Sequence, residues 1–80
     1  MVKVELSIQA KSGKWMTKEI VCVRPNLGED ILCDDEEFEV HAIAVQSGED
    51  KVLARVVHSS GKKLSARLLS GMGFFPVEND

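Results

Sequence analysis

Two arginines and a histidine are the residues in this sequence whose types and spacing could recognise an anion. His41, Arg55 and Arg67 fall on three consecutive segments with strand-like patterning. In the register that aligns these segments, the three side chains form a row across one face of a sheet. Arginines that face each other repel unless an anion or a carboxylate lies between them. The row therefore predicts either a small anion site or a solvated surface that an acid such as Glu39 neutralises.

The other reactive residue types do not form a motif for catalysis, for metal binding or for a cofactor. A nucleophile needs a base beside it, and the histidines, serines and cysteines show no spacing that joins them. Cys22 and Cys33 lie in apolar, strand-like contexts without a Cys-x-x-Cys pair, which is typical of reduced, buried thiols. The four carboxylates at 34–37 lack the spacing of a calcium loop, so they predict a solvated turn, with a cation site or an acidic docking surface as alternatives. We expect no catalytic residue, no metal and no cofactor.

Alternation of apolar residues at every second position indicates β-strands along most of the chain. The segments that carry His41, Arg55 and Arg67 are predicted strands at 38–46, 51–58 and 63–69, and the turns between them, at 47–50 and 59–62, contain glycine. One face of these three strands is uncharged, and we expect it to form the main core. Its members are Phe38, Val40, Ala42, Ala44, Val52, Ala54, Val56, Leu64, Ala66 and Leu68.

Two longer strands and one short one complete the predicted sheet. Residues 2–10 and 15–23 alternate and are joined by a turn at 11–14, so they predict a hairpin. Residues 31–33 predict a very short strand or a pinned loop segment. Near the C-terminus, Phe74, Phe75 and Val77 supply bulk that the alanine-rich strands lack. One phenylalanine is expected to plug the core; the alternative is that both rings are exposed as an interaction motif.

These elements predict an all-β fold, a small antiparallel meander or barrel of five to six strands. Eighty residues are enough for one modest core, so we expect a single domain over 1–80 with a polar tail at 78–80. In strand count, length and long middle strands the chain resembles the SH3-like class of small barrels, which implies an architecture and no function. An OB-type barrel is the alternative, but the turn at 47–50 is too short for the helix that such barrels usually carry between strands three and four.

Composition bears on the class of partner. The net charge is −3, and the aromatic residues are one Trp, three Phe and no Tyr, which disfavours nucleic acid as the partner. The N-terminus has no apolar run typical of a signal peptide, and no run of the chain is long enough to cross a bilayer. We therefore expect a cytoplasmic protein that does not act on a membrane.

The face opposite the predicted core gives the main functional hypothesis. Its apolar members are Ile43, Val45, Leu53, Val57 and Leu69, more than one small core needs. Trp15, beside the first turn, either anchors a partner or caps the core. We expect a small cytosolic binding module without catalytic activity, such as an adaptor, inhibitor or assembly subunit, which docks another protein or a second copy of itself. The alternative is a small barrel that binds nucleic acid or an anion through His41, Arg55 and Arg67, with Lys62 and Lys63 nearby.

Overall fold

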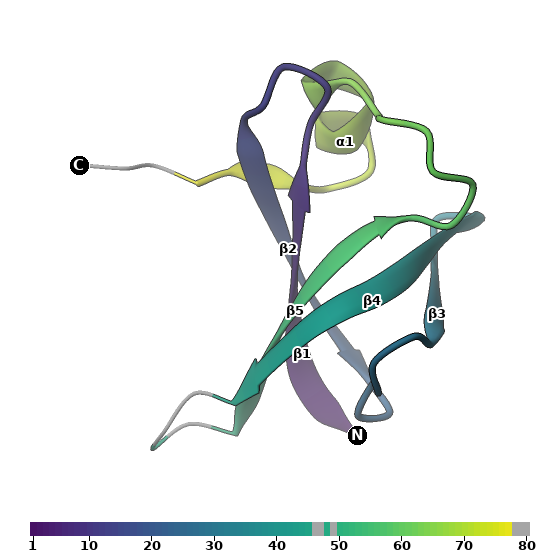
Figure 1. The fold of residues 1–80 in the computed structure, drawn as a ribbon. Helices are drawn as coiled ribbons and strands as arrows, with labels where there is room; N and C mark the ends of the chain where they lie inside the picture. The colour runs from purple at the N-terminus through teal and green to yellow at the C-terminus, as the bar shows by residue number, and fades with distance from the viewer. Residues whose placement is uncertain (46–47, 49, 78–80) are drawn as a thin grey trace.

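One curled sheet dominates the computed structural model, which describes residues 1–45, 48 and 50–77. In chain order the described elements are β1 (Val2–Gln9), β2 (Trp15–Cys22), β3 (Asp30–Cys33), β4 (Glu36–Val45), β5 (Lys51–His58), α1 (Ala66–Gly71) and β6 (Phe75–Pro76) (Figure 1). The six strands lie in the order β3-β4-β5-β1-β2-β6 and curl into a half-barrel. The predicted all-β class is therefore confirmed. The predicted polar tail at 78–80 lies outside the described residues, as do Gln46, Ser47 and Glu49 of the predicted strand end and turn.

The strand pairing is mixed rather than wholly antiparallel. β1 and β2 form the predicted hairpin, with Gln9 opposite Trp15 and a turn in which Gly13 has a φ of 94°. The β4–β5 pair is also an antiparallel hairpin. β5 then runs parallel to β1, from Lys3 opposite Lys51 to Ser7 opposite Arg55. The pairing of β1 with β5 thus joins segments far apart in the chain, so no turn motif in the sequence predicts it.

The core lies on the inner, concave side of the curled sheet. Alternate residues of β1, β4 and β5 point into it, among them Leu6, Phe38 and Val56, which are buried. The ring of Phe74 packs 6.1 Å from that of Phe38, centroid to centroid, so Phe74 plugs the core. Its neighbour Phe75 is 71% exposed. The prediction that one phenylalanine plugs the core is therefore confirmed, and the alternative in which both rings are exposed is wrong.

The strand predicted at 63–69 is wrong, because this segment ends in the short helix α1. Ser65 begins the helix: its hydroxyl accepts a hydrogen bond from the backbone N–H of Leu68 at 3.1 Å. Leu64 is buried and Ala66 packs against the core as predicted, but the helix reverses the predicted sides of the last two residues, so that Leu69 is fully buried and Leu68 is 48% exposed. Within the described part of the chain, no helix has the length and apolar character that crossing a membrane requires.

A β-bulge in β4 corrects the predicted sides of that strand. Val40 pairs with Val56 and Ala42 pairs with the adjacent Arg55, so one extra residue, His41, lies on the β4 side. Beyond the bulge every side chain changes side relative to the prediction. Ala42 and Ala44, expected in the core, are exposed, whereas Ile43 packs against the core. Val45, at the end of the strand, is 57% exposed.

Candidate binding surface

The outer, convex face of the sheet carries a cluster of apolar and aromatic side chains around one arginine. The strand register places Ala42, Arg55, Ser7, Thr17 and Phe75 in one row from β4 to β6. Val57 and Trp15 belong to the adjacent row, and the backbone N–H of Val77 donates to the carbonyl of Trp15 at 3.0 Å. We call this cluster the outer patch and define it as Trp15, Arg55, Val57, Phe75 and Val77.

Arg55 lies over the indole ring of Trp15 at the centre of the outer patch. The guanidinium carbon is 4.8 Å from the ring centroid, within the range of a cation–π contact. The two residues are on β5 and β2, with β1 between them, so the arginine side chain crosses a neighbouring strand. The residue of β1 that pairs with Arg55 is Ser7, whose small side chain leaves space for this crossing. Among the described residues, no carboxylate lies within ion-pair distance of Arg55.

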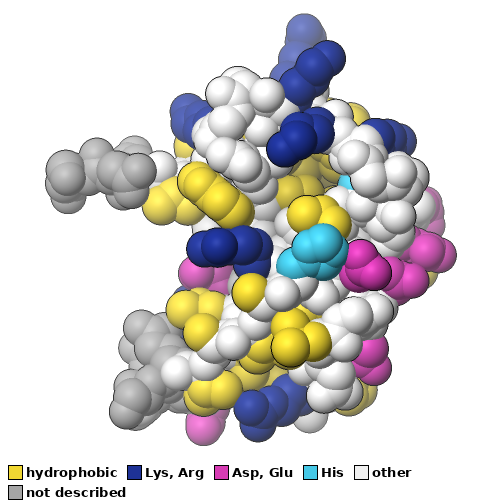
Figure 2. Space-filling view, in the orientation of Figure 1, with side chains coloured by type: hydrophobic (Ala, Val, Ile, Leu, Met, Phe, Trp, Pro, Cys, Tyr) yellow, Lys and Arg dark blue, Asp and Glu magenta, His cyan; other side chains and the backbone are white. Residues whose placement is uncertain are grey.

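The apolar members of the outer patch are open to solvent. Val57 is 38% exposed, Phe75 71% and Val77 40%. Figure 2 shows hydrophobic side chains lying beside a histidine and basic side chains across the face in view. Single exposed apolar residues are ordinary, but Trp, Phe and Arg gathered on one face match the composition of protein–protein hot spots.

Two hollows flank Arg55. One has a volume of about 160 Å³ and is lined by Trp15, Val57, His41, Lys62 and Lys63 together with Arg55. The other, of about 270 Å³, is lined by Ala42, Ala44 and Leu53 with Glu5 and Ser7. The first hollow thus combines an apolar wall with a basic rim, whereas the second is apolar with a carboxylate at its edge.

The structure brings together only some of the residues that the sequence suggested for function. Trp15, Leu53, Val57, His41 and Arg55 line the outer face or its hollows. The predicted row of three cations is not formed, because Arg67 is on α1 rather than on a strand of the sheet. Nε2 of His41 lies 2.8 Å from the Glu39 carboxylate, so Glu39 partners the histidine.

The predicted apolar face is likewise divided. Leu69 is on the buried side of α1, and the bulge in β4 turns Ile43 toward the core. Val45 belongs to a different pocket at the far end of β4. Phe75 and Val77, from the C-terminal segment for which an interaction motif was the alternative, join the outer patch because β6 pairs with β2 beside Trp15.

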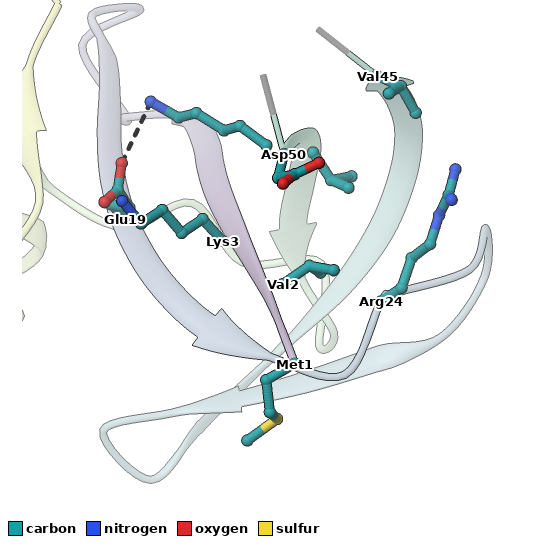
Figure 3. Close-up of a pocket in the computed structure, with 9 residues that line it drawn as sticks. Met1, Val2, Lys3, Glu19, Arg24, Val45 and Asp50 are labelled. Atoms are coloured by element: carbon teal, nitrogen blue, oxygen red, sulfur yellow. Dashed lines mark ion pairs between the residues drawn. The ribbon is translucent and has the colours of Figure 1, made fainter. Parts of the chain in front are cut away.

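A pocket larger than these two hollows lies away from the outer patch, near the start of β1 (Figure 3). It has a volume of about 850 Å³, and its lining includes Met1, Lys3, Glu19, Arg24 and Lys51. The Lys51 ammonium is 3.2 Å from the Glu19 carboxylate and 3.3 Å from that of Glu5. These hydrogen bonds, first that to Glu19, raise the pKa of Lys51. Since Lys51, one of the cations that line this pocket, is already paired within the chain, we do not assign a ligand to the pocket.

A buried histidine has polar partners that the sequence did not predict. His58 is 8% exposed; its Nε2 is 2.6 Å from the Glu36 carboxylate and its Nδ1 is 2.7 Å from the Ser60 hydroxyl. The hydrogen bond with His58 is the main cause that lowers the pKa of Glu36. A serine, a histidine and an acid in this order could activate a nucleophile. However, the backbone N–H of Ser60 also donates to Nδ1, at 3.1 Å, so the ring nitrogen that would take the serine proton is engaged in the turn.

Lys18 bridges the open side of the half-barrel, between β2 and the end of β3. Its ammonium donates to the Met72 carbonyl at 2.7 Å and lies 3.3 Å from the Asp34 carboxylate and 3.4 Å from the Cys33 sulfur. Burial acts to lower the pKa of Lys18, but the contacts with Cys33 and Asp34 outweigh it, so the pKa is raised. Of the four acidic residues at 34–37, Asp34, Asp35 and Glu37 are exposed, as the predicted solvated turn requires, and Glu36 is partly buried against His58.

Both cysteines are free thiols. Cys33 is buried and Cys22 is half-buried, and burial raises the pKa of the Cys22 thiol. Over residues 1–45, 48 and 50–77, no three His, Cys, Asp or Glu side chains converge in a way that would hold a metal ion.

The outer patch therefore has exposed apolar area, an arginine that contacts an aromatic ring, and a hollow beside that arginine. Surfaces that bind other proteins combine such features. No protein-family model matches this chain, and no curated protein and no solved structure matches it.

Proposed function

We propose that this chain is a binding module without catalytic activity that docks a protein partner on the outer patch. The observation that carries the proposal is the contact of Arg55 with Trp15 at 4.8 Å, at the centre of exposed apolar side chains. Aromatic residues and arginine are enriched at interface hot spots, because they combine a large contact area with directed polar contacts. An adaptor, an inhibitor and an assembly subunit would each use such a surface.

A second copy of the chain is one form of this proposal. The face originally expected for self-association does not exist as a unit, since Leu69 is buried and Ile43 packs on the core. Self-docking would therefore use the outer patch.

The SH3-like style of the fold and the cytoplasmic location stay predictions from the sequence.

Binding of nucleic acid or of a small anion is the second candidate function. It is favoured by Lys62 and Lys63, which line the same hollow as Arg55. Carboxylates on the same face oppose it: Glu39 is beside His41, and Glu5 lines the hollow on the other side of Arg55. The protein partner is the better supported of the two.

Site-specific photo-cross-linking tests the proposed function. A photoreactive residue in place of Val57 is expected to give a discrete adduct with one protein in cells that express the chain. The same residue in place of Leu32 is the matched control, because Leu32 is 68% exposed on β3 and lies outside the outer patch. The Val57 adduct should disappear in a Trp15→Ala background. Equal adducts from both positions, or none from Val57, would contradict the proposal.

A further inference from the structure

We infer that the segment docked on the outer patch is acidic, a stretch in which an apolar side chain is flanked by Asp or Glu. This inference rests on the proposed function and names the chemistry of the partner. Three features carry it: a cluster of basic side chains next to the outer patch, an arginine with no carboxylate partner among the described residues, and a small apolar hollow between them.

The basic side chains gather at one end of the molecule. Five of the ten Lys and Arg residues lie there: Lys11, Lys14, Lys62, Lys63 and Arg67. A backbone hydrogen bond of 2.8 Å from Lys11 N–H to the Leu64 carbonyl holds the first turn against the segment before α1. All five are exposed, and none has a described carboxylate within ion-pair distance. In Figure 2 several dark blue side chains lie close together in the upper part of the view, around the position of α1 and the adjoining turns. Although the net charge of the chain is −3, this end of the molecule therefore has a local positive potential.

Arg55 connects this basic end to the outer patch. Its contact with Trp15 restricts the guanidinium, and a guanidinium offers paired donors that match a carboxylate. The hollow beside it, of about 160 Å³, is comparable to the volume of about five water molecules at ~30 Å³ each. That is space for one apolar side chain against Trp15 and Val57. A neighbouring carboxylate would then reach Arg55, and further acids would face Lys62 and Lys63.

The same observations favour an acidic peptide over nucleic acid. Bases stack on open aromatic faces, whereas the indole of Trp15 is already covered by Arg55. Phe75, 71% exposed, is the aromatic ring of the outer patch that stays open, and the other exposed apolar members, Val57 and Val77, are aliphatic. Aliphatic side chains recognise other apolar side chains and give little to a base or a phosphate.

A titration of the ¹⁵N-labelled chain, followed by amide chemical shifts, tests the inference. The probe is a short capped peptide of alternating Glu and Leu. The comparison probes are the same peptide with Lys for Glu, the same peptide with Ser for Leu, and a short oligothymidine. We expect the Glu–Leu peptide to bind most tightly and to shift the amides of Trp15, Arg55, Val57, Lys62 and Lys63. Its affinity should fall as salt is added, because the basic side chains are exposed.

Charge reversal identifies the residues that bind. Arg55→Glu should weaken the Glu–Leu peptide by roughly tenfold or more. Arg24→Glu makes the same charge change in the distant pocket near the start of β1 and should leave the affinity within about twofold. Arg55→Gln removes the charge and keeps a shorter polar side chain, so it should also weaken binding, and it replaces Arg55→Glu as the test variant if the charge reversal disturbs the fold.

Several results would overturn the inference. The lysine peptide or oligothymidine could bind more tightly than the Glu–Leu peptide, or the Arg55→Glu and Arg24→Glu variants could bind the Glu–Leu peptide with equal affinity. Concentration-dependent shifts of the same amides without any probe would also overturn it, because they would identify a second copy as the occupant. The cross-link at Val57 separates the two proposals. A specific adduct whose cross-linked segment lacks Asp and Glu overturns this inference alone, whereas the absence of a Val57 adduct overturns both.

Discussion

The contact between Trp15 and Arg55 should be measurable as a coupling energy in the free chain. The perturbation is a double-mutant cycle of Trp15→Ala, Arg55→Ala and the double variant. Each single change removes the cation–π contact, so the two effects on the free energy of unfolding should not add. A guanidinium 4.8 Å from the ring centroid at a partly exposed site gives an expected coupling of ~0.5–1 kcal/mol.

The coupling translates into a shift that thermal unfolding can resolve. For a chain of this size, 1 kcal/mol moves Tm by roughly 4–8 °C, so the double variant should lose ~2–8 °C less than the sum of the single losses. Urea unfolding at one temperature gives the same quantity from the midpoints and slopes.

A second cycle supplies the control. Arg24 follows the far end of β2, so Trp15→Ala and Arg24→Ala should be additive within ~0.5 kcal/mol. If the Trp15–Arg55 coupling is no larger than that of the control pair, the guanidinium is not held on the indole in solution. The outer patch would then lose its centre, and the reasoning about the patch would be refuted.

Three further predictions test the fold around the outer patch. Leu69→Ala should cost ~2–5 kcal/mol and Leu68→Ala within ~0.5 kcal/mol, because only Leu69 is fully buried; similar costs in urea unfolding would refute the helical assignment of this segment. Phe38→Ala should cost ~3–5 kcal/mol of a total on the order of 4–12 kcal/mol; a wild-type Tm would show that Phe38 is not in the core. Glu36 has a lowered pKa in the folded chain, so its contribution is present above its ordinary pKa of 4.5 and is lost as the pH falls below that value. Glu36→Gln should therefore flatten the fall of Tm below about pH 4.5; an unchanged acid profile would contradict the His58–Glu36 contact.

Alternation predicted the long strands well, because a strand with one buried face displays its period directly. The strand predicted at 51–58 has the observed bounds of β5, and the predicted starts of the first two strands match those of β1 and β2. For the segment at 63–69, the same alternation predicted a strand where the structure has a helix. Leu64, Ala66 and Leu68 alternate, and a helix of six residues is too short for its own period to stand out. Ser65 was the available signal, as a residue type that favours the start of a helix.

The candidate site was only partly predictable, because two long-range features assemble it. The bulge in β4 opposite Arg55 has no signature in residue type, yet it decides that Ala42 faces outward and Ile43 inward. The parallel pairing of β1 with β5 sets Ser7 beside Arg55 and so allows the arginine to reach Trp15 across a strand. The sequence predicted Trp15, Arg55 and Val57 as separate candidates for binding, and only the order of the strands in the sheet brings them together.

The most direct test of the outer patch as a docking surface is the affinity of the partner captured at Val57 for three forms of the chain. These are the wild type, Trp15→Ala and Leu32→Ala, measured by isothermal titration calorimetry. Trp15→Ala should weaken binding by roughly tenfold or more, as truncation of a hot-spot aromatic does, while Leu32→Ala stays within about twofold of the wild type. Equal affinities of the two variants would contradict the account, because the partner would then bind without using the centre of the outer patch.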